Sequence, residues 1–283
     1  MPPLLFFATR VSLIIRQESG LLTFGTTAIN RQQTHVREDH IMSSEMISVI
    51  DLDAELQTQS PRKILKYALS QFDNIAISFS GAEDVVLIDM AHSIRPDVQV
   101  FTLDTGRLHA ETYRFIEKVR NHYGIKIDVL SPDAEAVREL VHEKGLFSFY
   151  QDNHQECCGI RKIQPLRKKL HQVDAWITGQ RKDQSPGTRA GIPVIQNDTT
   201  FARPDAILTK FNPLANWSSQ DVWDYIRGNN LPYNELHDKG FISIGCEPCT
   251  KPIGPGQHER EGRWWWEEAT KKECGLHGEN IKE

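Results

Sequence analysis

The chemistry that this sequence can offer is concentrated in its 5 cysteines. Cys157 and Cys158 are adjacent, Cys246 and Cys249 form a C-x-x-C pair, and Cys274 stands alone near the C-terminus. Thiolates grouped in two close pairs suit a metal ion or an iron–sulfur cluster with four sulfur ligands. The remaining thiol is then available as a nucleophile. This grouping indicates a redox enzyme.

The two cysteine pairs leave more than one kind of site open. A C-x-x-C pair also occurs in zinc ribbons and in thioredoxin-like redox pairs. Adjacent cysteines are unusual ligands, because a strand sends neighbouring side chains to opposite faces and a helix sends them about 100° apart. We therefore expect a special backbone conformation at Cys157 and Cys158. Buried cysteines beside a structural zinc ion are the alternative, although zinc sites rarely use adjacent cysteines.

Composition excludes several classes of protein. A chain of 283 residues that is 39% hydrophobic can bury one substantial core. An odd and sparse set of cysteines argues against a secreted disulfide scaffold and for a reducing cytoplasm. The formal net charge of −5 predicts no general affinity for nucleic acid. No apolar run reaches the ~18–20 residues of a membrane span, so we expect no membrane association.

Strands and helices alternate over the middle of the chain. Ser60 and Pro61 open an amphipathic helix, with proline at its first position. Short apolar runs predict strands at 74–79, 98–103, 126–130, 175–178 and 206–211, and helical periodicity predicts helices at 85–93, 109–123, 133–143 and 218–227. This alternation predicts an α/β fold with a parallel sheet flanked by helices.

The chain divides into three parts on this reading. Residues 1–45 are expected to be a poorly ordered N-terminal extension that carries no recognisable chemistry. Residues 46–240 form the α/β nucleotide-binding and catalytic domain. Residues 241–283 form an irregular C-terminal segment that holds the C-x-x-C pair and Cys274, and this segment is rich in glycine, proline and tryptophan without periodicity.

The predicted turns 78–84, 104–107 and 179–183 all follow strands, so they should meet at the edge where parallel sheets bind ligands. The first of them, within SFSGAEDV, joins a strand to a helix through small residues. Glycine permits close approach of a ligand, and a helix N-terminus attracts an anion. The turn lacks the lysine of a Walker loop and the glycine spacing of a dinucleotide fingerprint. Alone, such a turn is most often only a turn.

This turn resembles the modified phosphate loop of the adenine-nucleotide α-hydrolase-like superfamily. Pyrophosphatase members of that superfamily carry a fuller S-G-G-x-D-S loop. Here Ala82 and Glu83 interrupt the pattern. A carboxylate at the position of pyrophosphate argues against ATP cleavage and favours a sulfonucleotide.

Longer blocks resemble the assimilatory adenylyl-sulfate (APS) reductase family between about residues 75 and 277. They are, in order, SFSGAED, FTLDTGRLHAET, CCGIRKIQPL, GQRKDQSPGTRA, GFISIGCEPCT, GQHEREGRWWW and KKECGLH. The resemblance implies reduction of APS to sulfite and AMP, with thioredoxin as the electron donor. It also implies a [4Fe–4S] cluster on Cys157, Cys158, Cys246 and Cys249. Relatives that use 3′-phosphoadenylyl sulfate (PAPS) typically lack both cysteine pairs but keep the ECGLH end.

The resemblance also assigns roles to single residues. Cys274 is expected to attack the sulfate sulfur, and His277 to orient or activate it. Lys162 is expected to link the cluster to the substrate, and Arg260 and Arg263 to bind the phosphosulfate. The candidates on the nucleotide side are Ser78, Ser80, Gly81, Asp84, Leu103, Thr105, Gly179 and Arg189.

Other functions compete with APS reduction. A PAPS reductase or an enzyme of dual specificity is the nearest alternative. A nucleotide-dependent transferase or ATP pyrophosphatase with structural metal is another, and Ala82, Glu83 and the lone Cys274 count against it. A noncatalytic zinc-binding scaffold leaves Cys274 unexplained. We expect a cytoplasmic protein, and the sequence leaves a homo-oligomer open.

Overall fold

The computed structural model describes residues 49–152, 154–185, 188–254 and 256–267. All of them belong to the compact unit Glu45–Glu283. No helix among these described residues is long and apolar enough to cross a membrane. The domain boundaries expected at residues 45/46 and 240/241 stay predictions.

A six-stranded sheet forms the centre of this unit, with the strand order β3-β2-β1-β4-β6-β5. All neighbouring strands run parallel except the edge strand β5, which is antiparallel to β6. Ile77 pairs with Val100 on one side and with Ile177 on the other, which sets the register at the centre. The strands are β1 (Ile75–Ser78), β2 (Gln99–Leu103), β3 (Ile127–Leu130), β4 (Ala175–Ile177), β5 (Ile195–Asn197) and β6 (Thr209–Phe211).

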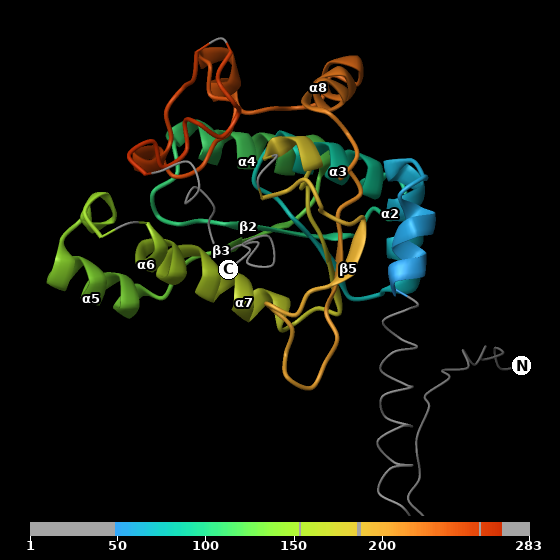
Figure 1. Cartoon of the computed structure of the whole chain (residues 1–283), viewed down its shortest axis with the longest axis horizontal. Helices are drawn as coiled ribbons and strands as arrows, with labels where there is room; N and C mark the ends of the chain where they lie inside the picture. Colours follow the sequence, from blue (N-terminus) through green and yellow to red (C-terminus); the bar gives the residue numbers. More distant parts are fainter. Residues whose placement is uncertain (1–48, 153, 186–187, 255, 268–283) are drawn as a thin grey trace, which may run out of the picture. The chain divides into compact units, whose positions relative to one another are not determined.

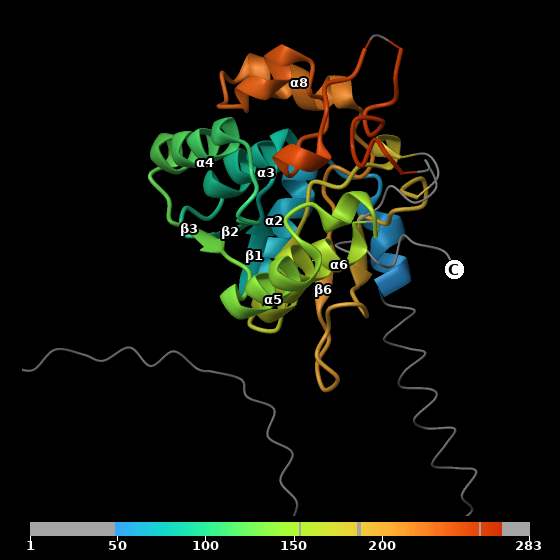
Figure 2. The same ribbon diagram turned by 90° about the vertical axis from the view of Figure 1, so that its left-hand side faces the viewer.

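Helices cover both faces of the sheet (Figures 1 and 2). One face packs against α2 (Pro61–Gln71), α3 (Ala82–His92), α4 (Ala110–Tyr123) and α8 (Ser219–Gly228). The opposite face packs against α7 (Gln164–Leu170), and α5 (Ala134–Lys144) and α6 (Gln155–Cys158) precede α7 in the chain. The predicted fold class, a parallel sheet flanked by helices, is confirmed.

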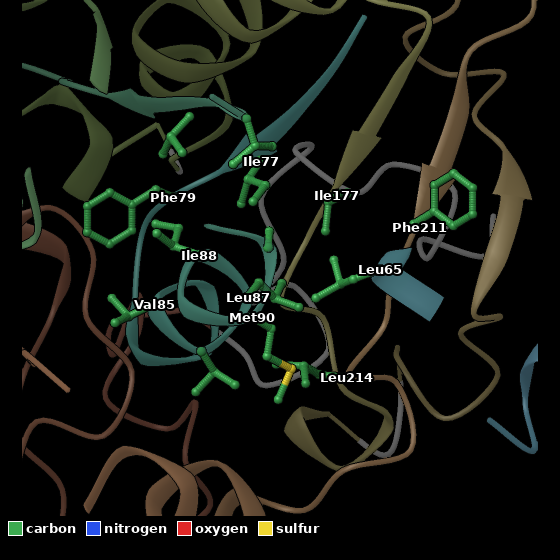
Figure 3. Packing of buried hydrophobic residues seen from close by; sticks show 14 of the residues in the cluster. Leu65, Ile77, Phe79, Val85, Leu87, Ile88, Met90, Ile177, Phe211 and Leu214 are labelled. Carbon is green, nitrogen blue, oxygen red and sulfur yellow. The ribbon is translucent and has the colours of Figure 1, made fainter. Parts of the chain in front are cut away.

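The alternation of side chains along β1 divides the core between the two faces. Ile75 and Ile77 belong to the larger cluster, and Ala76 between them belongs to the smaller one. Figure 3 shows Ile77 and Ile177 facing the side chains of α2 and α3, among them Leu65 and Ile88. This core fixes the carboxyl ends of the central strands, from which the site is built.

Two differences from the predicted elements have local causes. Helix α3 begins at Ala82 rather than at residue 85, because the Asp84 carboxylate accepts hydrogen bonds from the backbone N–H groups of Ser80 and Gly81. The edge strand β5 has only 3 residues, which is too short for an alternating pattern to be visible in the sequence.

Truncation of Ile77 should destabilise the protein strongly, because its side chain is fully buried between the sheet and the helices. We expect Ile77→Ala to lower the free energy of unfolding by about 2–5 kcal/mol. Urea unfolding followed by circular dichroism measures this. The matched control is Ile207→Ala, at a position that is 59% exposed, where the change should stay within about 0.5 kcal/mol. Equal losses in the two variants would contradict this account of the core.

Candidate functional site

A cavity of about 200 Å³ lies at the carboxyl ends of β1, β2 and β4. The turns after these three strands contribute to its wall, as the sequence predicts for a parallel sheet. The C-terminal segment contributes further residues from outside the sheet. All of the residues expected on the substrate side border this cavity: Ser78, Ser80, Gly81, Asp84, Leu103, Thr105, Lys162, Gly179, Arg189, Arg260 and Arg263.

The Asp84 carboxylate joins two of the turns that form the cavity. One oxygen accepts hydrogen bonds from the Ser80 N–H at 2.7 Å, the Ser80 hydroxyl at 2.9 Å and the Gly81 N–H at 2.9 Å. The other oxygen accepts the Gly179 N–H at 3.0 Å. Burial, together with the neighbouring charge of Glu83, raises the pKa of Asp84 to about 6 against the opposing effect of these donors. Asp84 thus fixes the turn after β1 to the turn after β4.

Gly179 is a position where only glycine fits. A Cβ atom on this residue would lie 2.6 Å from Asp84 Oδ1 and 2.6 Å from Glu83 Cβ. The backbone of the turn after β4 can therefore approach the start of α3 only without a side chain.

A buried arginine connects the same turns to the C-terminal segment. The Arg181 guanidinium, which is 1% exposed, donates to Glu83 at 2.9 Å and to Glu259 at 3.1 Å. It also pairs with Asp183. Burial raises the pKa of Glu259 to about 7. The positive charge of Arg181 lowers this pKa only in part, and the negative charge of Glu83 raises it further. These contacts hold Glu259, and with it the start of the segment that carries Arg260 and Arg263.

Cations gather at another part of the cavity, around the fully buried Trp264. Arg263, Lys162 and Arg260 lie 4.6, 5.8 and 5.9 Å from the centre of its ring. Gly245 allows the Arg263 side chain to cross the backbone, because a Cβ there would lie 2.6 Å from the guanidinium carbon. An anion that enters this end of the cavity would meet several positive charges at once.

The four paired cysteines border a second, smaller cavity. Cys157 and Cys158 end α6, and the next residues, Gly159–Ile163, form a π-helical turn (η2). Cys157 and Cys158 themselves have α-helical backbone, and the irregular conformation expected at the pair begins only at the following residue, Gly159. Cys246 and Cys249 flank the short 3₁₀ turn Glu247–Cys249. Lys162 and Cys246 belong to the walls of both cavities, so the thiols and the cation-rich pocket share one wall.

The thiols differ in how their surroundings treat a negative charge. Burial opposes ionisation of Cys246, but Lys162 and a hydrogen-bond contact of 3.2 Å with the Thr105 hydroxyl hold its pKa below the ordinary value. Burial raises the pKa of Cys249 to about 12 and also raises that of Cys157. Among the described residues, no group of three or more cysteine, histidine or acidic side chains has the spacing of a metal-ion site.

Two predicted site residues lie outside the described part of the chain, and several residues that line the cavity were not predicted from the sequence. Cys274 and His277 are not among the described residues, so their roles stay predictions. Gln180, Gln184 and Glu259 also border the cavity, and they were not predicted from the sequence. The only signal for the first two was their place in the predicted turn after a strand, and nothing in the local sequence singled out Glu259.

A parallel sheet, a helix that starts at a tight Ser-Gly turn, and a cavity beyond the strand ends together define an α/β enzyme of the nucleotide-binding type. Residues 74–252 match the phosphoadenosine phosphosulfate reductase domain. The chain belongs to this family.

Relatives and a solved structure agree with this membership. The chain is 59% identical over 255 residues to adenosine 5′-phosphosulfate reductase of Pseudomonas aeruginosa, which covers 90% of this chain and 96% of that protein. It is 53% identical to chloroplastic 5′-adenylylsulfate reductase 3 of Arabidopsis thaliana, over 90% of this chain and 58% of the plant protein. The crystal structure of phosphoadenylyl-sulfate reductase from Candida auris, a phosphate complex, superposes with a TM-score of 0.60 at 26% identity, over 81% of this chain and 100% of that one.

Substitution of Gly179 by alanine should weaken nucleotide binding, because the added Cβ displaces the start of α3 from the turn after β4. We expect AMP to bind at least about tenfold more weakly, a change of about 1.4 kcal/mol. Isothermal titration calorimetry measures this. Gly191→Ala is the matched control, since a Cβ there meets nothing within 4 Å. Equal affinity in the two variants would rule out the close approach as a determinant of the site.

Stability should depend on pH through Glu259. The pKa of Glu259 is about 7 in the folded protein, above the ordinary 4.5 of the unfolded chain. The contribution of this carboxyl group to the free energy of unfolding is therefore fully present below pH 4.5 and is lost as the pH rises through about 7. Glu259→Gln cannot ionise. Between about pH 5 and pH 8, the stability of the wild type should therefore fall by about 3 kcal/mol relative to this variant.

Urea unfolding at several pH values measures this difference. The exposed Glu139 provides the control, as Glu139→Gln. Parallel stability curves for the wild type and Glu259→Gln would contradict the prediction.

Proposed function

We propose that the protein reduces adenylyl sulfate to sulfite and AMP in sulfate assimilation, with thioredoxin as the reductant. Membership of the phosphoadenosine phosphosulfate reductase family and the names of the relatives support this activity. The observation that carries the proposal is the shared wall. Lys162 and Cys246 join the four-cysteine cavity to a cation-lined cavity at the nucleotide edge of the sheet.

The charges of the cavity suit the two ends of this substrate. The phosphosulfate would lie near Lys162, Arg260 and Arg263, whose charges offset those of its oxygens. The nucleoside would lie at the turn formed by Ser78, Ser80 and Gly81 and the residues after β2 and β4. Neutralisation matters because the sulfate oxygens otherwise repel an attacking thiolate.

The reaction proceeds in two exchanges at sulfur. The Cys274 thiolate attacks the sulfate sulfur, an S–S bond forms, and the S–O bond to phosphate breaks so that AMP leaves with the electron pair. A thioredoxin thiolate then attacks Cys274 Sγ, and sulfite leaves with the pair of the S–S bond. The second thioredoxin thiol resolves the mixed disulfide. Sulfur is reduced by two electrons, and the dithiol is oxidised to a disulfide with loss of two protons.

A [4Fe–4S] cluster would be held by Cys157, Cys158, Cys246 and Cys249. The donor set supports this group, because all four thiols border one small cavity and Lys162 favours a thiolate at Cys246. When bound, the cluster supplies structural support and negative charge beside Lys162.

PAPS reduction is the second candidate, because the domain description and the Candida auris structure both name that substrate. Glu83 favours APS. Its carboxylate lies in the first turn of α3, where a further phosphate would otherwise be attracted. A cytoplasmic location agrees with the need for reduced thiols.

Cysteine variants test the reaction and the cluster separately. In anaerobically purified protein, Cys274→Ser should lower thioredoxin-dependent sulfite release from APS by at least about a thousandfold, since the nucleophile is lost, and should keep the wild-type iron content. Cys249→Ser should lower the iron content itself. Sulfite is assayed with APS and PAPS side by side. Equal release from both nucleotides would favour dual specificity, and release from neither by iron-loaded wild type would refute the proposed function.

A further inference from the structure

Gln180 is a buried residue of the cavity wall whose side chain has no hydrogen bond to any residue that the structure describes. The residue borders the larger cavity and is 3% exposed. In the part of the chain that the structure describes, neither Oε1 nor Nε2 has a partner. A buried amide without partners is costly, because it has given up water and received nothing in return.

The neighbouring Gln184 provides the contrast. Its Nε2 donates to Glu83 at 2.9 Å, and its Oε1 accepts the Arg181 N–H at 3.1 Å and a bond from Arg189. Two glutamine amides thus lie in the same turn of the cavity wall. The Gln184 amide has hydrogen-bond partners at both its nitrogen and its oxygen, whereas the Gln180 amide has none among the described residues.

The backbone on both sides of Gln180 is fixed. The Gly179 N–H is bonded to Asp84, and the Arg181 side chain is anchored to Glu83 and Glu259. The Gln180 N–H itself contacts the Thr178 hydroxyl at 3.4 Å. The position of the residue is therefore set by its neighbours, while its side-chain amide has no partner within the described ranges of the chain. A polar group that is held in place but makes no hydrogen bond to the protein is typical of a group that binds a ligand.

We propose that Gln180 is a specificity residue that binds the uncharged nucleoside part of the substrate, with Nε2 as donor and Oε1 as acceptor. This inference rests on the proposed function, which supplies an adenine nucleotide as the ligand. The amide is covered in the structure, and rotation of its side chain presents it to the cavity when the nucleotide enters. Either the adenine edge or the ribose hydroxyls offer the paired donor and acceptor that a glutamine amide matches.

Charge assigns Gln180 to the nucleoside rather than to the phosphosulfate. Beside Gln180, the acidic side chains around Arg181 are accompanied by Arg189, which bonds to Gln184 in the same wall. Three cations gather instead around Trp264, in another part of the cavity. A phosphosulfate would meet more positive charge around Trp264 than beside Gln180. A neutral group that both donates and accepts hydrogen bonds would match the Gln180 amide.

The proposal predicts opposite effects on stability and on binding. Gln180→Met keeps the length of the side chain and removes both unpartnered polar atoms. The ligand-free protein should therefore unfold at the same or a higher temperature. AMP should bind about tenfold more weakly, and the KM for APS should rise more than kcat falls.

The experiment uses the intact, anaerobically purified protein as wild type, Gln180→Met and Gln184→Met. Calorimetry measures binding of AMP, of IMP, which lacks the 6-amino group, and of 2′-deoxy-AMP and 3′-deoxy-AMP. Thermal unfolding is followed without nucleotide. The analogue that lacks the recognised group should bind equally to the wild type and to Gln180→Met, which distinguishes the base from the sugar. Gln184→Met should lower the unfolding temperature, because it removes one hydrogen bond to the buried Glu83 carboxylate and one from the Arg181 N–H.

Two outcomes would overturn the proposal. One is wild-type affinity of Gln180→Met for AMP, and the other is a lowered unfolding temperature with equal weakening towards every analogue. If wild type releases sulfite and binds AMP while Gln180→Met behaves like it, only this inference fails. If iron-loaded wild type neither binds AMP nor releases sulfite, the proposed function itself fails.

Discussion

The candidate site depends on the hydrogen bonds that the Asp84 carboxylate accepts from two turns. Its two oxygens face different turns, one at the start of α3 and the other after β4. Neither turn has a core of its own, and each is held at the end of a short buried strand. Because the carboxylate accepts donors from both, the distance between the turns is set by one side chain. The lack of a Cβ at Gly179 is the counterpart of this arrangement, since the second oxygen approaches that backbone closely.

Arg181 extends the same principle to a segment that the sheet does not contain. Its guanidinium reaches Glu83 at the start of α3 and Glu259 in the C-terminal segment. Three acidic side chains thus gather around Arg181, whereas three cations gather around Trp264 in another part of the cavity. A molecule with a neutral end and a strongly anionic end matches this separation. The polarity of the cavity therefore orients its ligand before any catalytic group acts.

The sequence predicts the sheet and much of the cavity, because both follow from local patterns. Buried apolar runs mark the central strands, and the ends of parallel strands must meet at one edge. Ser80, Thr105 and Gly179 follow from that rule together with the resemblance. Lys162, Arg260 and Arg263 came only from the resemblance, since no periodicity connects them to the sheet.

Other parts were invisible for physical reasons. Arg181 and Glu259 are charged residues in polar stretches, and they become buried only because distant segments meet. Gln180 is distinguished by an amide that has no partner in the described part of the chain, and no sequence pattern indicates this. A ligand role for the adjacent Cys157 and Cys158 could be predicted from the sequence, but their backbone conformation could not. Their adjacency predicted an irregular backbone at the pair, whereas the structure has a short α-helix there and places the π-helical turn directly after it.

The wall shared by the two cavities couples the shape of the pocket to the positions of the four thiols. Thr250, next to Cys249, forms an isolated β-bridge with Arg263, and Arg161 next to Lys162 donates to the Thr105 carbonyl at 2.7 Å. The residues that line the pocket are thus bonded to the residues that flank the thiols. A displacement of the thiols would therefore move the cations and the turn after β2 together, so that the geometry around the sulfur atoms also sets the geometry of the pocket.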